Sequence, residues 1–516
     1  MRVRLITVPS WFPENPGDRL EYVALSHRWG KIEQCITTNQ NVTERMVWFP
    51  ASKLPQTFVD ACFVTACLGF RYLWIDALCI LQDGPEDWDV ESLKMGDVFQ
   101  AAQVVIAAHG AHDAAEGFLE KALRLREEDE ATLLTEPVVS LRLRPNFDAD
   151  VVRSHLSMRG WVMQERMLAT RTLHFAQGHI YLESPRGVWI EGDSEASALF
   201  YGGAQHFSDG KTMTGAVNQL LHPDTFPRTA AAPEILGLGS DNLSTQWASL
   251  IQLYSSCGLT KEEDKLIAIS GIANAIHRII GGFHFAGLWS HCLTRGLLWI
   301  RQSEQLTFPA RRRAPSWSWA SVDGPVQYPA EAHSDKCVAE CSVFVQDDPF
   351  ATIATVSHWL QNPPSIILQG HMVNLGPYLH NGSNPCHNMP VWLSPHSRSN
   401  QQHHTYGWSL PIPTLQHPVL RFGVVNERAA HIDRDEVIIG WFSLDNHTRR
   451  GEGETEVEET LRTWDENVLF AQVVQHADGM SLGILLAPCK GKYVRIGTGQ
   501  LRYIRFEWEV KEVEII

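Results

Sequence analysis

The feature that most constrains the fold is an alternation of short apolar runs with helical patterns over the first 185 residues. LEYVALS (20–26), RYLWID (71–76) and QVVIAA (103–108) are largely apolar runs of strand length, as expected for strands buried on both faces. Helical patterns separate them, over 54–69, which ends in a glycine stop signal, and from 87 to 102. Strands that alternate with helices predict an α/β fold with a parallel sheet and right-handed crossovers.

Polar residues follow each of the three predicted strands. Ser26 and His27 come at the end of the first strand, Asp76 at the end of the second, and His109 after the third. The carboxyl ends of parallel strands lie at one edge of a sheet, and ligands of such folds bind there. We therefore expect these side chains to line one strand-end cleft that takes a nucleotide or another small molecule.

The segment SHRWG (26–30) leaves the first predicted strand as a loop. Its backbone amides, with Arg28 to meet a phosphate and Trp29 to stack on a base, predict a nucleotide-binding rim that ends at Gly30. The alternative is a turn stabilised by Ser26 in which Trp29 packs as a plug. The residues alone leave both interpretations open.

Four parts are expected along the chain. They are an α/β domain (1–190), an irregular linker or insertion (191–240), a helical region (241–325) and a β-rich C-terminal domain (326–516). Within the first part, the helical pattern returns at 157–171 after a long polar connection, and 172–184 predict two short strands.

The segment APSWSWASVDG closes the predicted helical region. Alternation by two residues places Trp317 and Trp319 on one face of an extended segment. We expect this segment to be a packing seam between the helical region and the β-rich domain.

Composition excludes several classes of protein. The chain has 43 lysines and arginines against 59 aspartates and glutamates, a formal net charge of −16, so no nucleic-acid partner is expected. No apolar run approaches the roughly 20 residues of a membrane helix, so no membrane segment is expected. The ten cysteines lack paired CxxC spacing, which predicts free thiols in a reducing compartment and a cytoplasmic protein.

Motifs for metals and phosphates are lacking as well. The histidines of the polar stretch after Cys386 have no regular ligand spacing, so we expect a loop and no metal site; they are His387, His396, His403 and His404. Neither GxGxxG nor the P-loop pattern occurs, which disfavours kinases, P-loop enzymes and standard Rossmann dehydrogenases.

Five segments of the first 185 residues carry a family resemblance. They are YVALSHRWG, LPQTFVDA, LGFRYLWIDALCILQDGPEDW, MGDVFQAAQVVIAA and RGWVMQERMLATRTLHF. In content and order they resemble the blocks of the HET domain of fungal heterokaryon-incompatibility proteins, over residues 18–185. DKLIAISGIA and RAPSWSWASVDG resemble segments that often follow this domain. The resemblance implies a role in fungal non-self recognition, where activation of the domain leads to cell death.

The HET domain is in turn similar to TIR domains, which are small flavodoxin-like α/β modules. LCILQD and VVIAA resemble two TIR segments, and WVMQE keeps the spacing of the TIR pattern WCxxE, with Val162 in place of the cysteine. The glutamate of that pattern is catalytic in the TIR domains that cleave NAD. The resemblance thus implies a catalytic Glu165, with Trp161 as a wall of the base site.

The chemistry of NAD cleavage explains why one carboxylate is enough. The bond between ribose and nicotinamide breaks with loss of a neutral leaving group, so no general acid is required, unlike in most glycosidases. A single carboxylate can stabilise the oxocarbenium-like transition state. The alternatives for Glu165 are an exposed helix charge paired with Arg166 or Arg159, or a buried structural salt bridge.

Cys79 supports a separate hypothesis. It lies three residues after Asp76, near a first helical turn where a helix dipole lowers the thiol pKa, and His27 could act as its base. That pair would make a hydrolase or acyltransferase. The alternative is a buried small hydrophobe, with Asp76 as a helix cap.

Three functional hypotheses follow. The domain hydrolyses NAD or a related nucleotide, with NAD as substrate and no cofactor required. Alternatively, it is a non-catalytic signalling module that works by self-assembly or with an incompatibility partner protein. Alternatively, it is a small-molecule enzyme that uses Cys79 and His27.

Overall fold

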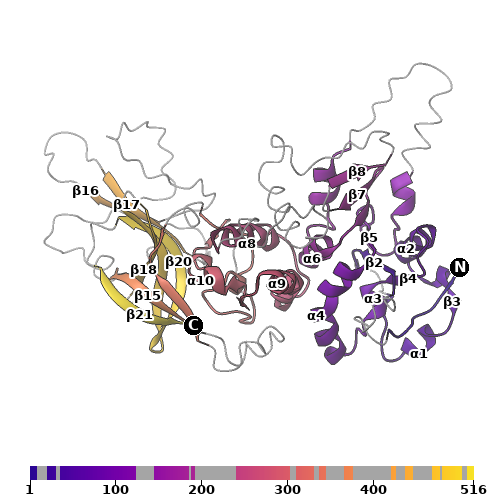
Figure 1. Ribbon diagram of the computed structural model, residues 1–516, viewed down its shortest axis with the longest axis horizontal. Helices are drawn as coiled ribbons and strands as arrows, with labels where there is room; N and C mark the ends of the chain where they lie inside the picture. The colour runs from indigo at the N-terminus through magenta and orange to yellow at the C-terminus, as the bar shows by residue number, and fades with distance from the viewer. Residues whose placement is uncertain are drawn as a thin grey trace, which may run out of the picture. The chain divides into compact units, whose positions relative to one another are not determined.

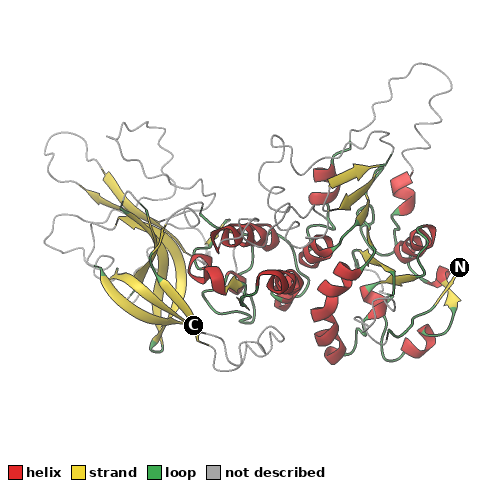
Figure 2. Ribbon diagram, in the orientation of Figure 1, coloured by secondary structure: helices red, strands yellow, loops and turns green. Residues whose placement is uncertain are grey.

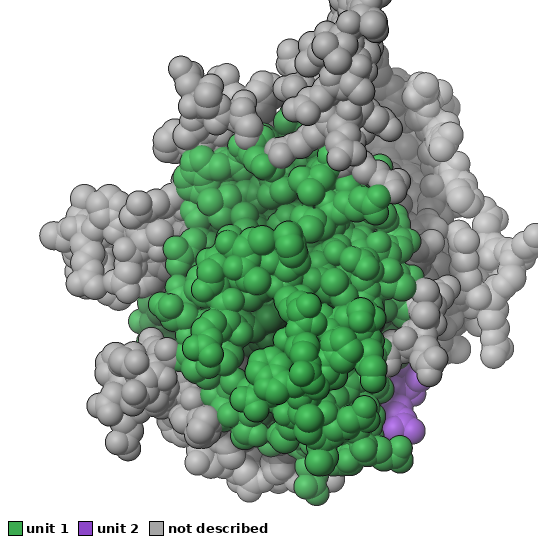
Figure 3. Space-filling view, turned by 90° about the vertical axis from the view of Figure 1, so that its right-hand side faces the viewer, with its two compact units in different colours: residues 1–231, 257–281 green, residues 232–256, 282–516 purple. Residues whose placement is uncertain are grey.

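The computed structural model describes residues 1–8, 20–30, 35–123, 145–184, 187–191, 240–302, 309–329, 336–344, 365–375, 420–425, 436–444, 468–476, 479–502 and 508–516. The chain divides into two compact units. Unit 1 comprises Met1–Ala231 and Cys257–Gly281, and unit 2 comprises Ala232–Ser256 and Gly282–Ile516 (Figure 3). The four histidines after Cys386 and nearly all of the predicted linker lie outside the described residues.

Unit 1 is built on a six-stranded sheet with the order β4-β2-β5-β6-β7-β8 (Figure 1). Its strands are β2 (Tyr22–Ser26), β4 (Tyr72–Trp74), β5 (Val104–Ala107), β6 (Thr172–Phe175), β7 (Ile180–Ser184) and β8 (Gly187–Ile190). β4, β2, β5 and β6 run parallel, whereas β7 and β8 continue the sheet antiparallel. The predicted α/β fold with parallel strands is confirmed, and β8 was not predicted.

Helices cover both faces of this sheet because successive residues of each strand point in opposite directions. Val23 and Leu25 of β2 belong to the core that α2 (Gln56–Cys67) completes with Phe58. On the opposite face, the Tyr22 hydroxyl donates to the carbonyl of Val98 in α4 at 2.6 Å. α4 spans Pro85–Ala101, and α6 (Gly160–Leu168) packs beside it (Figure 2).

A helix from a distant part of the chain also packs in unit 1. α9 (Ile267–Ile280) lies against α4 and α6, and it approaches α4 where two glycines meet. A Cβ atom added to Gly96 would lie 2.6 Å from the Cα atom of Gly271. An ion pair of 2.6 Å joins Arg278 of α9 to Asp97 of α4. The sequence pattern had grouped this helix with residues 241–325.

Unit 1 also contains several smaller elements. They are β1 (Arg2–Val3), α1 (Val42–Arg45), β3 (Phe49–Pro50), a 3-10 helix (Ala51–Lys53), the short helical turn α3 (Asp76–Cys79) and a π-helical turn (Asp148–Val152). β1 and β3 pair antiparallel.

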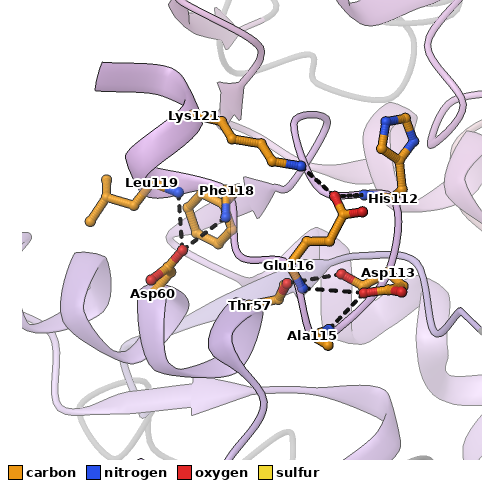
Figure 4. Close-up of polar contacts among 9 residues, drawn as sticks. All are labelled: Thr57, Asp60, His112, Asp113, Ala115, Glu116, Phe118, Leu119 and Lys121. Carbon is orange, nitrogen blue, oxygen red and sulfur yellow. Dashed lines mark hydrogen bonds and ion pairs between the residues drawn. The ribbon is translucent and has the colours of Figure 1, made fainter. Parts of the chain in front are cut away.

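The loop that leaves β5 is anchored on α2 by one buried carboxylate (Figure 4). Asp60 Oδ2 accepts the backbone N–H groups of Phe118 at 2.8 Å and Leu119 at 3.0 Å, and Oδ1 accepts from the Gln56 amide at 2.7 Å. Asp60 therefore satisfies donors that would otherwise be buried without a partner.

We expect Asp60→Ala to lower the free energy of unfolding by about 1.5 kcal/mol, because two backbone donors lose a charged acceptor. Urea denaturation measures this loss. The control is Glu116→Gln in the same loop, which removes the exposed ion pair with Lys121. An exposed pair contributes less than about 1 kcal/mol. Equal losses in the two variants would contradict the anchoring role of Asp60.

Unit 2 combines helices with a nine-stranded sheet. Five of its strands, β18, β15, β21, β20 and β19, pair in a closed ring, because β19 pairs with both β18 and β20. The strands of the sheet are β13 (Lys336–Cys337), β14 (Glu340–Phe344), β15 (Ser365–Asn374), β16 (Leu420–Val425), β17 (Glu436–Leu444), β18 (Leu469–Gln475), β19 (Met480–Cys489), β20 (Lys492–Arg502) and β21 (Glu509–Ile515). The predicted β-rich C-terminal part is confirmed.

The other elements of unit 2 precede this sheet. They are α8 (Ser240–Ser255), β9 (His284–Phe285), β10 (Leu288–Trp289), a 3-10 helix (Ser290–Cys292), α10 (Leu293–Gly296), β11 (Ile300–Arg301), a 3-10 helix (Trp319–Ser321) and β12 (Val326–Gln327). In the described part of the chain, no helix combines the length and the apolar character that crossing a membrane requires.

The tryptophans of WSWAS are fully buried, but the segment is not extended. Turns lead into the 3-10 helix that begins at Trp319, because the Ser318 hydroxyl accepts the N–H of Ala320 and starts the helical turn. The predicted extended conformation is therefore wrong. The packing seam is present within unit 2: Trp299 Nε1 donates to the carbonyl of Trp317 at 3.0 Å, and the Arg495 guanidinium from β20 lies 3.5 Å from the Trp299 ring.

Candidate functional site

The parallel pairing of the sheet brings the predicted polar residues to one edge. Ala24 of β2 lies opposite Trp74 of β4, so both strands end at the same edge. Ser26 is the last residue of β2, and Asp76 follows β4 directly after Ile75. On the other side, Ser26 pairs in register with Ala107, the last residue of β5.

Asp76 is fixed at this edge by three neighbours. Trp29 Nε1 donates to Asp76 Oδ2 at 2.7 Å, and the Ala77 N–H donates to Oδ1 at 2.7 Å. His27 Nδ1 lies 3.6 Å from Oδ1. Trp29 thus packs against the core of unit 1 and orients Asp76, while its ring stays only partly buried.

Glu165 is a buried residue, only 6% exposed, and does not lie on the surface of α6. Burial is the main cause that raises the pKa of its carboxyl to about 7. The Ser26 hydroxyl and the Arg159 guanidinium act to lower that pKa, and the Asp76 carboxylate acts to raise it. Glu165 therefore shares its surroundings with Ser26, Asp76 and Arg159, at the strand-end edge.

Arg159 precedes α6 and supplies the positive charge of the site. Its guanidinium donates to the backbone carbonyl of His27. The first N–H of the helix, from Gly160, donates to the Gly258 carbonyl at 2.9 Å. Arg159 is only partly buried, so its remaining donors can reach a ligand.

Arg166 is not the partner of Glu165, although it follows it in sequence. Arg166 Nε lies 2.6 Å from Glu183 Oε2, and Arg166 Nη2 lies 2.8 Å from Glu183 Oε1. The predicted alternative of a surface glutamate paired with Arg166 is thereby excluded.

Trp161 points toward the segment that α9 belongs to. Its Nε1 donates to Asp264 Oδ2 at 3.2 Å, and its ring meets Trp88 edge-on at 6.0 Å between centroids. Lys261 lies 5.2 Å from the Trp88 ring. The indole is 9% exposed, and these contacts make it a packing residue between α4, α6 and this segment.

His27 is buried on the α2 side of the sheet, where its ring meets Phe58 edge-on at 5.0 Å between centroids. Burial is the first cause that lowers its pKa, with Arg159 acting in the same direction and Asp76 against both. His27 Nε2 has no hydrogen-bond partner among the described residues. The ring is therefore neutral, and Nε2 is available for a hydrogen bond.

Cys79 ends the four-residue turn α3 and does not begin a longer helix. The residue keeps exposed surface, but protein packed around the thiol, with the Asp76 and Glu91 carboxylates, raises its pKa to about 11. The expected lowering of the thiol pKa is wrong, because the turn is too short to carry a helix dipole and its neighbours are negative. No hydrogen bond joins Cys79 to His27 in the part of the chain that the structure describes.

The loop after β2 presents two further predicted residues. Arg28 is exposed and Gly30 is partly buried with a φ of +80°. A Cβ atom at Gly30 would lie 2.2 Å from Cβ of Asp113, so only glycine fits this approach to the loop after β5.

His109 lies at the predicted edge but takes part in a different group of side chains. Its Nε2 contacts His174 Nδ1 at 2.8 Å, and its Nδ1 contacts Ser154 Oγ at 2.7 Å. Across the described residues, no three His, Cys, Asp or Glu side chains assemble in a way that could hold a metal ion.

One part of the chain matches a known protein family. Residues 22–165 match the family model described as heterokaryon incompatibility protein (HET), so the resemblance seen in the sequence is confirmed. The HET domain implies a function of the heterokaryon-incompatibility type. Neither the curated proteins nor the solved structures include a match to the chain.

Proposed function

We propose that this HET domain acts in heterokaryon incompatibility by hydrolysing NAD or a related nucleotide, with Glu165 as its catalytic carboxylate. The observation that carries the proposal is the position of Glu165, which is buried beside Ser26, Asp76 and Arg159 at the carboxyl ends of parallel strands. A buried titratable group with a perturbed pKa and specific charged neighbours is typical of a functional site.

The strand order supports a ligand site at this edge. Numbered in chain order, the parallel strands β4, β2, β5 and β6 follow the order 2-1-3-4. This is the start of the flavodoxin-like order, whose ligand binds where the winding reverses, between the first and third strands. Here that point lies between β2 and β5, where Ser26 ends its strand. The proposal includes the similarity of this domain to TIR domains, which share the flavodoxin-like fold.

The residues present suit cleavage of the bond between ribose C1′ and the nicotinamide nitrogen. Nicotinamide leaves with the bonding electron pair as a neutral molecule, water adds to C1′, and its proton passes to solvent. The Glu165 carboxylate faces the positive charge that develops on the ribose. Arg159 is suited to a phosphate of the same nucleotide, with Arg28 and Trp29 as the rim of the site.

The experiment measures release of nicotinamide from NAD by the purified chain, alone and after induced assembly. We expect Glu165→Gln to lose the activity and Glu116→Gln, the exposed control, to keep it. Because the pKa of Glu165 is about 7, the rate should fall as the pH drops below 7 and the carboxylate is protonated.

Intact NAD in every wild-type sample, with toxicity unchanged in Glu165→Gln, would refute hydrolysis. The chain would then act as a non-catalytic signalling module that self-assembles or binds an incompatibility partner. The raised pKa of Cys79 gives the third hypothesis, a thiol enzyme, no support.

A further inference from the structure

A series of hydrogen-bonded polar side chains, with His174 and Glu183 buried at its centre, runs behind the helix that carries Glu165. Glu183 on β7 accepts hydrogen bonds from both Arg166 and His174. The distance from His174 Nε2 to Glu183 Oε2 is 2.9 Å. His174 lies on β6, and its other ring nitrogen meets His109. His109 in turn meets Ser154, whose Oγ also accepts the N–H of Ser157 at 3.2 Å.

The hydrogen bonds of this series have one consistent arrangement. Burial acts to raise the pKa of Glu183, but Arg166 and His174 together hold it well below its usual range, so Glu183 is an anion. Burial lowers the pKa of both His174 and His109, so both rings are neutral. An anionic Glu183 requires a proton on His174 Nε2, which leaves Nδ1 as an acceptor.

The same logic continues to the end of the series. His109 Nε2 must then carry the proton that it donates to His174 Nδ1. His109 Nδ1 is left as an acceptor, and the Ser154 hydroxyl donates a hydrogen bond to it. Each of these hydrogen bonds therefore has one donor and one acceptor, from Arg166 on α6 to Ser154 in the turn before α6.

The two ends of this hydrogen-bonded series, Ser154 and Arg166, lie on either side of Arg159 and Glu165 in the sequence. Ser154 precedes Arg159 in sequence, and Arg166 directly follows Glu165. One flank of the intervening stretch is therefore attached to β7 through Glu183, and the other is attached to His174 of β6 through His109, which follows β5. Phe147 supports the same arrangement, because its ring lies 5.4 Å from the Arg166 guanidinium and meets His174 edge-on at 5.6 Å between centroids.

We propose that Glu183 and His174 are positioning residues that hold Arg159 and Glu165 in the geometry of the site, through Arg166 on one flank and through His109 and Ser154 on the other. The inference rests on the proposed function of Glu165. Neither positioning residue touches the substrate. Their effect is to keep α6 and the preceding turn fixed, so that Glu165 stays shielded from water beside Ser26.

A titration of Glu165 itself tests this proposal. The full chain is labelled at glutamate carboxyls, and the Glu165 resonance is identified as the one absent from Glu165→Gln. In Glu183→Gln, α6 loses its attachment and water reaches Glu165. We expect its pKa to fall from about 7 by about one unit or more, toward the usual value. Ser154→Ala breaks only the far end and should shift it in the same direction by less.

The control is Glu116→Gln, the same substitution at an exposed ion pair of unit 1, which should leave the Glu165 titration unchanged. A merely structural role would lower the folded fraction without moving the pKa of Glu165 in folded molecules. If Glu183→Gln does not fold, Ser154→Ala decides alone. An unchanged Glu165 pKa in the folded variants would overturn the proposal.

The outcome is separable from that of the proposed function. If the wild-type protein leaves NAD intact, the proposal of hydrolysis fails, and the titration still decides whether Glu183 and His174 position Glu165. If NAD is hydrolysed but the pKa of Glu165 is unchanged in Glu183→Gln and Ser154→Ala, only the positioning role fails.

Discussion

Glu165→Gln should make unit 1 more stable at pH 8, by about 3 kcal/mol relative to the wild type. The carboxyl has a pKa of about 7 in the folded chain against an ordinary value of 4.5. Between these values the folded state holds a proton that the unfolded state releases, so wild-type stability falls as the pH rises from 4.5 to 7 and then levels off. Glutamine has the same shape and no charge, so the variant escapes this loss.

Below pH 4.5 the carboxyl is protonated in both states, and the gain should shrink toward zero. Urea unfolding at pH 4.5 and pH 8, followed by hydrogen exchange of peptides from β2 and β5, measures both limits. Glu183→Gln is the opposite case: the pKa of Glu183 is lowered in the fold, so its loss should destabilise unit 1 at pH 8. A gain for Glu165→Gln that is independent of pH would show that the carboxyl ionises normally.

Gly271→Val should cost unit 1 about 3 kcal/mol of unfolding free energy, because it forces two helices apart. A Cβ atom at this position would lie 2.6 Å from Gln164 Oε1 on α6 and 2.8 Å from the Cα atom of Gly96 on α4. It would also disturb the bond of 3.2 Å from the Gly271 N–H to Gln164. Glycine is therefore required where α4, α6 and α9 meet.

Hydrogen exchange of peptides from α6 and α9 checks the local effect, and urea unfolding checks the total. The matched control is Gly258→Val in the same segment, since the nearest atom to a Cβ there is the Met158 carbonyl oxygen at 3.9 Å. We expect slow exchange in the control and rapid exchange in Gly271→Val. Equal exchange in both variants would mean that the close approach of the helices is unimportant.

Local patterns were sufficient to predict the parallel strands β2, β4 and β5 of unit 1. Buried parallel strands are apolar on both faces, so 20–26, 71–76 and 103–108 stood out from their surroundings. The polar residues after them are brought together because parallel strands end at one edge. Ser26 and Asp76 follow this rule, and the family resemblance added Glu165, which lies beside both.

The residues that surround Glu165 from other directions could not be predicted in this way. The contacts of Trp161 with Asp264, and of Gln164 with Gly271, join segments about a hundred residues apart, and helical periodicity contains no information on such pairing. His174 did leave a signal, because a titratable residue within the apolar run TLHF is unusual unless it has a buried partner. That partner depends on the hairpin register of β6 and β7.

The segment Cys257–Gly281 is bracketed in sequence by the two parts of unit 2. This order has a consequence during synthesis. The ribosome completes α6 long before it reaches α9, and at about 5–20 residues per second the interval is on the order of ten seconds. A nascent chain therefore displays the α6 side that Trp161 and Gln164 later close against this segment. The packing around α6, which carries Glu165, is therefore completed only after the segment Cys257–Gly281 has been synthesised.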